Sequence, residues 1–155
     1  MGEAADTHSM FHLGYVVRDM AIAVRKWQGI GAQIIVPPTV DPIQNVTCAL
    51  LSYKSAVPIE LVSPADGGAN PLASRLAKGG GLDHICLFSD DVEADLITAV
   101  AEGGVVAVPP SYGAVFDRTI AFVVTRPGLV VEYMSRQALG RIPEDPLGRW
   151  LARTS

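Results

Sequence analysis

Apolar segments recur along the chain in an order that occurs twice. Each half opens with an apolar run of strand length, at 11–17 and at 83–88. Apolar residues at helical spacing follow at 20–27 and 92–101. An aspartate stands before each helical stretch, which is typical of a helix N-cap. Each half therefore begins as a strand followed by a capped helix.

Three further strands complete each half. A second strand is predicted to end at the Val-Pro-Pro tripeptides 36–38 and 108–110, because proline has no amide to donate to a sheet. The last two strands form a hairpin, and they are expected at 46–53 with 58–62 in the first half and at 119–125 with 129–134 in the second. The pattern predicts a βαβββ unit that occurs twice.

The two halves align without a gap at an offset of 72 residues. Between 12–63 and 84–135, ten of the 52 aligned positions are identical, whereas composition alone gives about three or four. We interpret the chain, residues 1–155, as one α+β domain. It is built from a first module at about 11–63, a linker with a helix at 64–82, a second module at about 83–135, and a tail at 136–155 that is expected to form a short helix.

The repeat places four metal-type ligands at equivalent positions. His12 and His84 lie on the first strands of the two modules, and Glu60 and Glu132 lie on the fourth strands. If the modules pack about a pseudo-twofold axis, all four side chains can converge there. A lone histidine in an apolar strand is more often a core residue, but an unpaired buried glutamate is costly. Two imidazoles and two carboxylates suit a divalent ion such as Zn, Ni, Co, Mn or Fe.

Strand alternation predicts which residues surround these ligands. Gly14 follows His12 by two positions and Cys86 follows His84 by two, so both small side chains should leave room beside the ion. Phe88 and Met134 lie on the same predicted face and are further candidate substrate contacts. Asp117 and Arg118, in a loop before a strand, either meet substrate or form a solvated pair.

Composition and charge narrow the classes of partner. The chain is 49% hydrophobic with a net charge of −4, and its 12 Lys and Arg residues form no stripe, which disfavours nucleic acid. Every apolar run is too short to cross a membrane. The first residues lack the pattern of a signal peptide, and two cysteines give no disulfide framework. We expect a cytoplasmic protein.

Several segments resemble the vicinal oxygen chelate superfamily, which includes glyoxalase I, methylmalonyl-CoA epimerase, extradiol dioxygenases and drug-resistance proteins. The similar segments are HLGYVVRD at 12–19, IELVSP at 59–64, NPLASRL at 70–76 and GGLDHI at 80–85. They are most similar to the epimerase-like and glyoxalase-like branch. QNV at 44–46 stands where epimerases carry a similar segment, so the resemblance adds Gln44 as a substrate-binding candidate.

The resemblance implies a curved mixed sheet around a central cavity, with His12, Glu60, His84 and Glu132 as metal ligands. It also implies an isomerase, epimerase or lyase that transfers a proton beside a carbonyl through a metal-stabilised enolate, with Glu132 or Glu60 as the proton-transfer group. The substrate would be a small carbonyl or carboxylate compound, with an acyl thioester as one option, and the protein would be a homodimer.

One position departs from the family pattern and leaves other functions open. Some epimerases carry a catalytic carboxylate on the third strand, where this chain has Thr47 and Cys48. An Fe(II)-dependent dioxygenase remains an alternative, although it needs only one carboxylate beside two histidines. A metal-free small-molecule binding or resistance protein is the other alternative.

Overall fold

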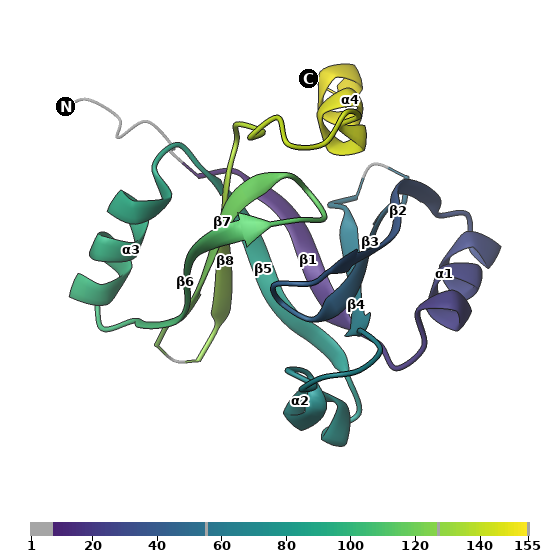
Figure 1. Ribbon diagram of the computed structural model, residues 1–155, viewed down its shortest axis with the longest axis horizontal. Coiled ribbons are helices and arrows are strands. Elements are labelled where there is room, and N and C mark those ends of the chain that lie inside the picture. Colours follow the sequence, from purple (N-terminus) through teal and green to yellow (C-terminus); the bar gives the residue numbers. More distant parts are fainter. Residues whose placement is uncertain (1–7, 55, 127, 155) are drawn as a thin grey trace.

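The computed structural model describes residues 8–54, 56–126 and 128–154, and it shows the two βαβββ modules in sequence (Figure 1). The elements of the first module are β1 (Met10–Val16), α1 (Met20–Gly29), β2 (Gln33–Asp41), β3 (Val46–Ser52) and β4 (Ile59–Pro64). The linker holds α2 (Ala73–Ala77). The second module has β5 (Gly81–Ser89), α3 (Val92–Ala101), β6 (Val105–Gly113), β7 (Arg118–Val124) and β8 (Val130–Ser135), and the tail forms α4 (Pro146–Thr154).

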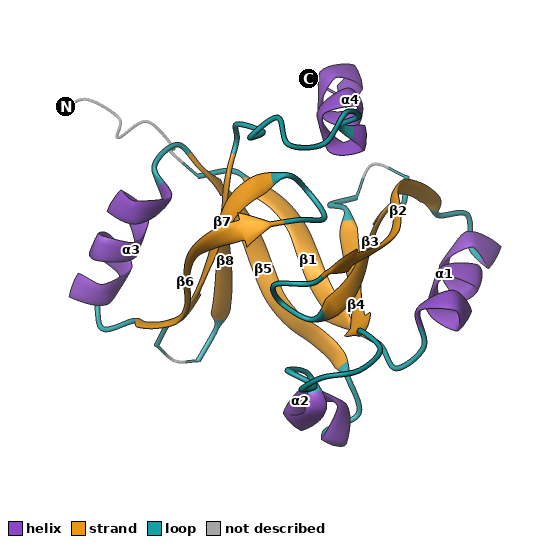
Figure 2. Ribbon diagram, in the orientation of Figure 1, coloured by secondary structure: helices purple, strands orange, loops and turns teal. Residues whose placement is uncertain are grey.

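All eight strands belong to one mixed sheet in the order β2-β3-β4-β1-β5-β8-β7-β6. The first strands of the two modules, β1 and β5, meet antiparallel at its centre, and each lies parallel to the fourth strand of its own module. Helices α1 and α3 pack on the outer sides of the two halves (Figure 2). The predicted α+β fold is confirmed.

The register of the central strands reveals the twofold relation between the modules. Leu13 of β1 pairs with Ile85 of β5, and these residues occupy equivalent positions in the repeat. The helix starts agree with the same relation, since Asp19 accepts a hydrogen bond from the Ile22 amide and Asp91 accepts one from the Ala94 amide. Both predicted N-caps are therefore present.

The prediction that the second strands end at Val-Pro-Pro is wrong. Strand β2 continues to Asp41 and β6 continues to Gly113. Both are edge strands. A proline is tolerated on an edge strand because the amide that it lacks can face the side without a neighbouring strand. Their pairing with β3 and β7 shifts register on either side of the prolines, between Val36 and Thr39 and between Val108 and Ser111. A bulge thus accommodates each proline pair without ending the strand.

The core lies on both faces of the sheet. One cluster, which includes Val24, Leu51 and Leu61, packs beneath α1, and a second cluster with Leu96 and Val123 packs beneath α3. A third and larger cluster fills the inner face between the modules. Helix α4 adds Leu147, which is fully buried, to this inner cluster, so the predicted tail helix forms part of the core.

Asp41 joins the two edges of the open sheet. Its carboxylate accepts hydrogen bonds from the Ile43 and Gln44 amides within the turn that follows β2. Its second oxygen accepts a hydrogen bond of 3.2 Å from the Ala114 amide, just beyond the end of β6. The side chain is 3% exposed. Asp41 therefore links the edge strand of one module to the edge strand of the other.

We predict that Asp41→Ala lowers the free energy of unfolding by about 2–4 kcal/mol, because three partly buried amides lose their acceptor. Urea unfolding followed by circular dichroism measures this change. Asp19→Ala is the comparison, since it removes a single cap within one module and should cost about 1 kcal/mol. Equal losses from the two substitutions would show that the link between the modules contributes nothing.

Candidate metal centre

The four predicted ligands come together at the centre of the sheet. In the strand register, Glu60 of β4 and His84 of β5 both pair with Gly14, which lies between them on β1. In the equivalent arrangement, His12 of β1 and Glu132 of β8 both pair with Cys86 on β5. Each His–Glu pair thus takes one residue from each module, and a small residue on the strand between them separates the two side chains.

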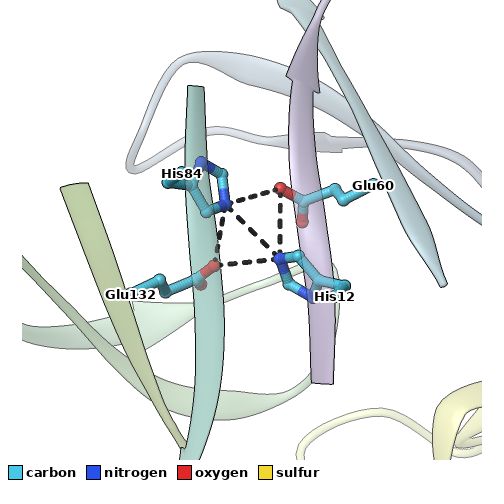
Figure 3. Close-up of side chains that lie close together, drawn as sticks. All are labelled: His12, Glu60, His84 and Glu132. Atoms are coloured by element: carbon cyan, nitrogen blue, oxygen red, sulfur yellow. Dashed lines mark hydrogen bonds and ion pairs between the residues drawn. The ribbon is translucent and has the colours of Figure 1, made fainter. Parts of the chain in front are cut away.

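Their donor atoms form a compact group (Figure 3). The Nε2 atoms of His12 and His84 are 3.4 Å apart, and each lies 3.1 Å from Oε2 of Glu132. Oε1 of Glu60 lies 3.5 Å from His84 Nε2 and 3.7 Å from His12 Nε2. One ligand atom from each residue falls within 4.8 Å of all the others. Four donors bound to one ion at about 2.1 Å would be spaced on this scale.

Burial makes this arrangement difficult to explain without a cation. The four side chains are nearly inaccessible, with exposures between 0% and 4%. Two carboxylates that are removed from water at this spacing repel each other unless positive charge compensates them. A divalent ion supplies that charge, and the donor set of two imidazole nitrogens and two carboxylate oxygens fits one.

A cavity of about 310 Å³ opens beside the cluster. Glu60, His84 and Glu132 form part of its wall, and Gln44 also lines it. Most of the remaining wall is apolar and comes from both modules and the linker. The cluster therefore lies at a site that a small molecule can reach.

The model of the family described as "Glyoxalase/Bleomycin resistance protein/Dioxygenase superfamily" matches residues 11–122. This chain belongs to that superfamily. The match includes both module starts, and the vicinal oxygen chelate fold expected from the resemblance is confirmed. A search of curated proteins by sequence found no match.

Solved structures with the same fold include methylmalonyl-CoA epimerases. The epimerase from Mycobacterium tuberculosis has a TM-score of 0.74 and 20% identity, over 88% of this chain and 93% of that one. A variant of the Streptomyces coelicolor epimerase, in complex with 2-nitronate-propionyl-CoA, has a TM-score of 0.71 and 23% identity, over 83% and 97%. A hypothetical protein from Bacillus halodurans gives 0.72 and 20%, over 88% and 100%. At these identities the likeness shows the fold alone.

Gly14 accommodates the ring of His84. A Cβ atom built on Gly14 would lie 2.0 Å from Cε1 of His84, far inside contact distance. The prediction that Gly14 leaves room beside the ion is wrong, because the imidazole of His84 itself occupies the space above Gly14.

A bulge in β5 brings Asp83 into contact with His84. Between Gly14 and Tyr15 of β1, the pairing on β5 moves from His84 to Leu82 and leaves Asp83 as an extra residue. A bulge re-aims side chains, and Asp83 Oδ2 lies 2.8 Å from Nδ1 of His84. Sequence reasoning missed this contact, since strict alternation places adjacent residues on opposite faces.

The electrostatics of the cluster follow from burial and these contacts. Burial raises the pKa of Glu132, but hydrogen bonds from His12 and His84 outweigh it and bring this pKa down to about 2. Burial likewise lowers the pKa of His84, but its hydrogen bonds to Asp83, Glu132 and Glu60 outweigh that effect and raise the pKa well above its ordinary value. In the metal-free protein, positive charge on His84 therefore compensates the acids.

Three predicted substrate contacts lie in the core and do not line the cavity. Cys86 and Met134 are fully buried, and Phe88 stacks on Phe11 with ring centroids 4.5 Å apart. The Phe11 ring covers Phe88, and Cys86 lies between His12 and Glu132 in the strand register. Cys48 does line the cavity, and burial together with Glu60 raises its pKa, which keeps the thiol protonated.

Asp117 and Arg118 hold the C-terminal segment in place. Asp117 is buried and accepts hydrogen bonds from the Tyr112 hydroxyl and from the amides of Gly140 and Arg141. The Arg118 guanidinium is also buried and pairs with Asp145 just before α4. Neither residue lines the cavity, so the suggestion that they meet substrate is not supported by their positions.

We predict that Gly14→Ala lowers affinity for Co²⁺ or Ni²⁺ at least tenfold, because a methyl group at that position displaces the His84 ring, and overpacking of this kind also costs about 1–3 kcal/mol of stability. Titration calorimetry on metal-free protein measures the affinity. Gly29→Ala is the control, since no atom lies within 4 Å of a Cβ there. Unchanged affinity in the Gly14 variant would contradict the assignment of His84 as a ligand.

A second prediction concerns the support of His84. Asp83→Asn should reduce metal affinity by about 10–100-fold, the usual effect of removing a carboxylate that orients a ligating histidine. Competition with a chromophoric chelator measures the constant. Asp66→Asn, at an exposed linker position, is the matched control. If both variants bind metal like the parent protein, the contact between Asp83 and His84 does not position the ligand.

Proposed function

We propose that this protein is a metal-dependent enzyme that transfers a proton at the carbon next to a carbonyl group, as an isomerase, epimerase or lyase. The observation that carries the proposal is the convergence of four buried donors, two from each module, at the wall of an apolar cavity. The superfamily includes proteins of several activities, and the methylmalonyl-CoA epimerases share the fold.

His12, His84 and Glu132 suit the role of fixed ligands. Their donor atoms are the most tightly grouped of the cluster, with separations of 3.1 to 3.4 Å. Asp83 holds His84 from its other nitrogen, which leaves Nε2 directed at the centre. A divalent ion held there would polarise the carbonyl of a substrate and lower the cost of forming the enolate.

Glu60 is the better placed proton-transfer group. Its nearest oxygen lies 3.5 to 3.7 Å from the two histidines, so it is engaged less closely than Glu132. The low pKa of Glu132 makes that carboxylate a weak base. Asp41 also borders the cavity, but three backbone amides already occupy its oxygens. We therefore assign proton transfer to Glu60 and support of the ion to Glu132.

The apolar wall favours a small-molecule binding protein as the second candidate. Such a protein would use the cavity without chemistry, and its ligand affinity would not depend on metal. Metal content after purification and ligand binding before and after chelation separate the two candidates. Oxygen consumption by the Fe(II)-loaded protein separates both from a dioxygenase.

The test of the proposed function is exchange of a carbon-bound proton. Nickel- or cobalt-loaded protein is incubated in D₂O with a panel of α-hydroxyketones and 2-substituted acyl thioesters, and exchange is followed by proton NMR. We expect exchange at the carbon next to the carbonyl, and we expect Glu60→Gln to reduce it at least about 100-fold while metal stays bound.

The matched control for this test is Glu93→Gln, at an exposed position on α3, which should exchange like the parent protein. Full exchange by the Glu60→Gln variant would show that Glu60 is not the base. Absence of bound metal in the parent protein after reconstitution would contradict the proposed function as a whole.

A further inference from the structure

Apart from His84, which an ion would hold as a neutral ligand, the ionisable side chains that charge the wall of the cavity are acidic. Four acidic side chains border it: Glu60 and Glu132 of the cluster, Asp41 at the end of β2 and Asp83 in the bulge of β5. In the described part of the chain, the wall contains no lysine or arginine. A divalent ion would neutralise the two glutamates, and Asp41 and Asp83 would remain as additional negative charges.

The nearby arginines are engaged elsewhere. Arg75 of α2 donates to the carbonyl of Leu82, and Arg18 donates to the carbonyl of Leu76. Arg118, two residues after the wall residue Phe116, donates to the Phe116 carbonyl and to Asp145. None of these guanidinium groups lines the cavity, so once His84 holds an ion no other basic side chain in the described wall offers an anionic group a partner.

The rest of the wall is apolar. Its side chains come from β3, β6, β7, β8, the linker and the turn before β7, and they include Val46, Leu72, Val108, Phe116, Phe122 and Val130. Gln44 supplies a neutral amide, which makes no side-chain hydrogen bond to the described residues. An unpaired carboxylate or phosphate in such a cavity would lose its hydration without gaining a partner.

We infer that the part of the substrate that enters the cavity is uncharged and apolar apart from the oxygens directed at the cluster. This inference rests on the proposed function and names its substrate class: a ketone, ester or thioester that carries an alkyl or aryl group beside the reacting carbon and carbonyl, and no additional carboxylate. A malonyl-type acyl group is disfavoured by the same charges. Gln44 would hydrogen-bond a neutral oxygen of the substrate.

Two probes of matched shape test the inference. 2-Hydroxy-4′-isopropylacetophenone and 4-(hydroxyacetyl)benzoate share the same hydroxyketone, and they differ only in whether the far end carries an isopropyl group or a carboxylate. Both are titrated into Co²⁺-loaded protein, and binding is followed by the visible spectrum of the ion and by calorimetry. We expect the isopropyl compound to bind at least about tenfold more tightly, since burial favours the apolar group and penalises the anion.

Two variants show whether wall charge causes the preference. Gln44→Arg places a cation in the wall and should strengthen binding of the benzoate, so that the ratio of the two affinities falls at least about threefold. Ile43→Arg adds the same charge one residue away, on a side chain that is 58% exposed and does not line the cavity. This control should keep the preference of the parent protein.

The outcomes separate this inference from the proposed function. Equal or tighter binding of the benzoate by the parent protein would overturn the inference, as would a Co²⁺ spectrum that neither compound changes, and both results would leave the metal centre intact. An unchanged preference in Gln44→Arg would show that wall charge does not set it and would also overturn the inference. Failure of the protein to bind Co²⁺ would instead contradict the proposed function, and the inference would fail with it.

Discussion

The pairing of β1 with β5 is the constraint on which the site depends. Four donors can meet at the centre of the sheet only if the residue between each His–Glu pair is small, because the two side chains of a pair come from strands that are not neighbours. Gly14 meets this condition for Glu60 and His84, where even a methyl group would overlap the imidazole. Cys86 meets it for His12 and Glu132. The cluster is therefore a consequence of register as much as of ligand identity.

The two modules supply equivalent metal ligands, but the residues around those ligands differ between the modules. The two central bulges are equivalent, and they place Asp83 before His84 but Phe11 before His12. Asp83 contacts Nδ1 of His84, whereas Nδ1 of His12 has no partner among the described residues and the Phe11 ring packs beside it, with centroids 4.6 Å apart. Asp41 likewise joins the sheet edges from one module only, since Gly113 is its counterpart. The Nδ1 side of His84 is therefore polar, whereas that of His12 is apolar.

The sequence predicted most of the fold because the repeat aligned both modules without a gap, and it predicted the convergence of the four donors from their equivalent positions. It did not predict features that depend on irregular pairing. The bulges that direct Asp83 toward His84 and carry β2 and β6 past their prolines leave no mark on the alternation of apolar residues. The burial of Cys86, Phe88 and Met134 could not be predicted either. The position of a residue in a strand predicts which face of the sheet its side chain lies on, but not what covers that face.

The buried carboxylates of the cluster need positive charge nearby, whether or not an ion is bound. Without an ion, the positive charge that compensates the buried acids comes from His84, whose pKa is raised by its hydrogen bonds to Asp83, Glu132 and Glu60. A divalent ion would displace the proton from the coordinating nitrogen of His84 and take over the compensation, so we expect metal affinity to rise with pH until His84 is neutral. The same exchange leaves the remaining acids of the wall, Asp41 and Asp83, without a cationic neighbour in the cavity. The same electrostatic arrangement therefore supports both the proposed metal centre and the inference that the substrate body is uncharged.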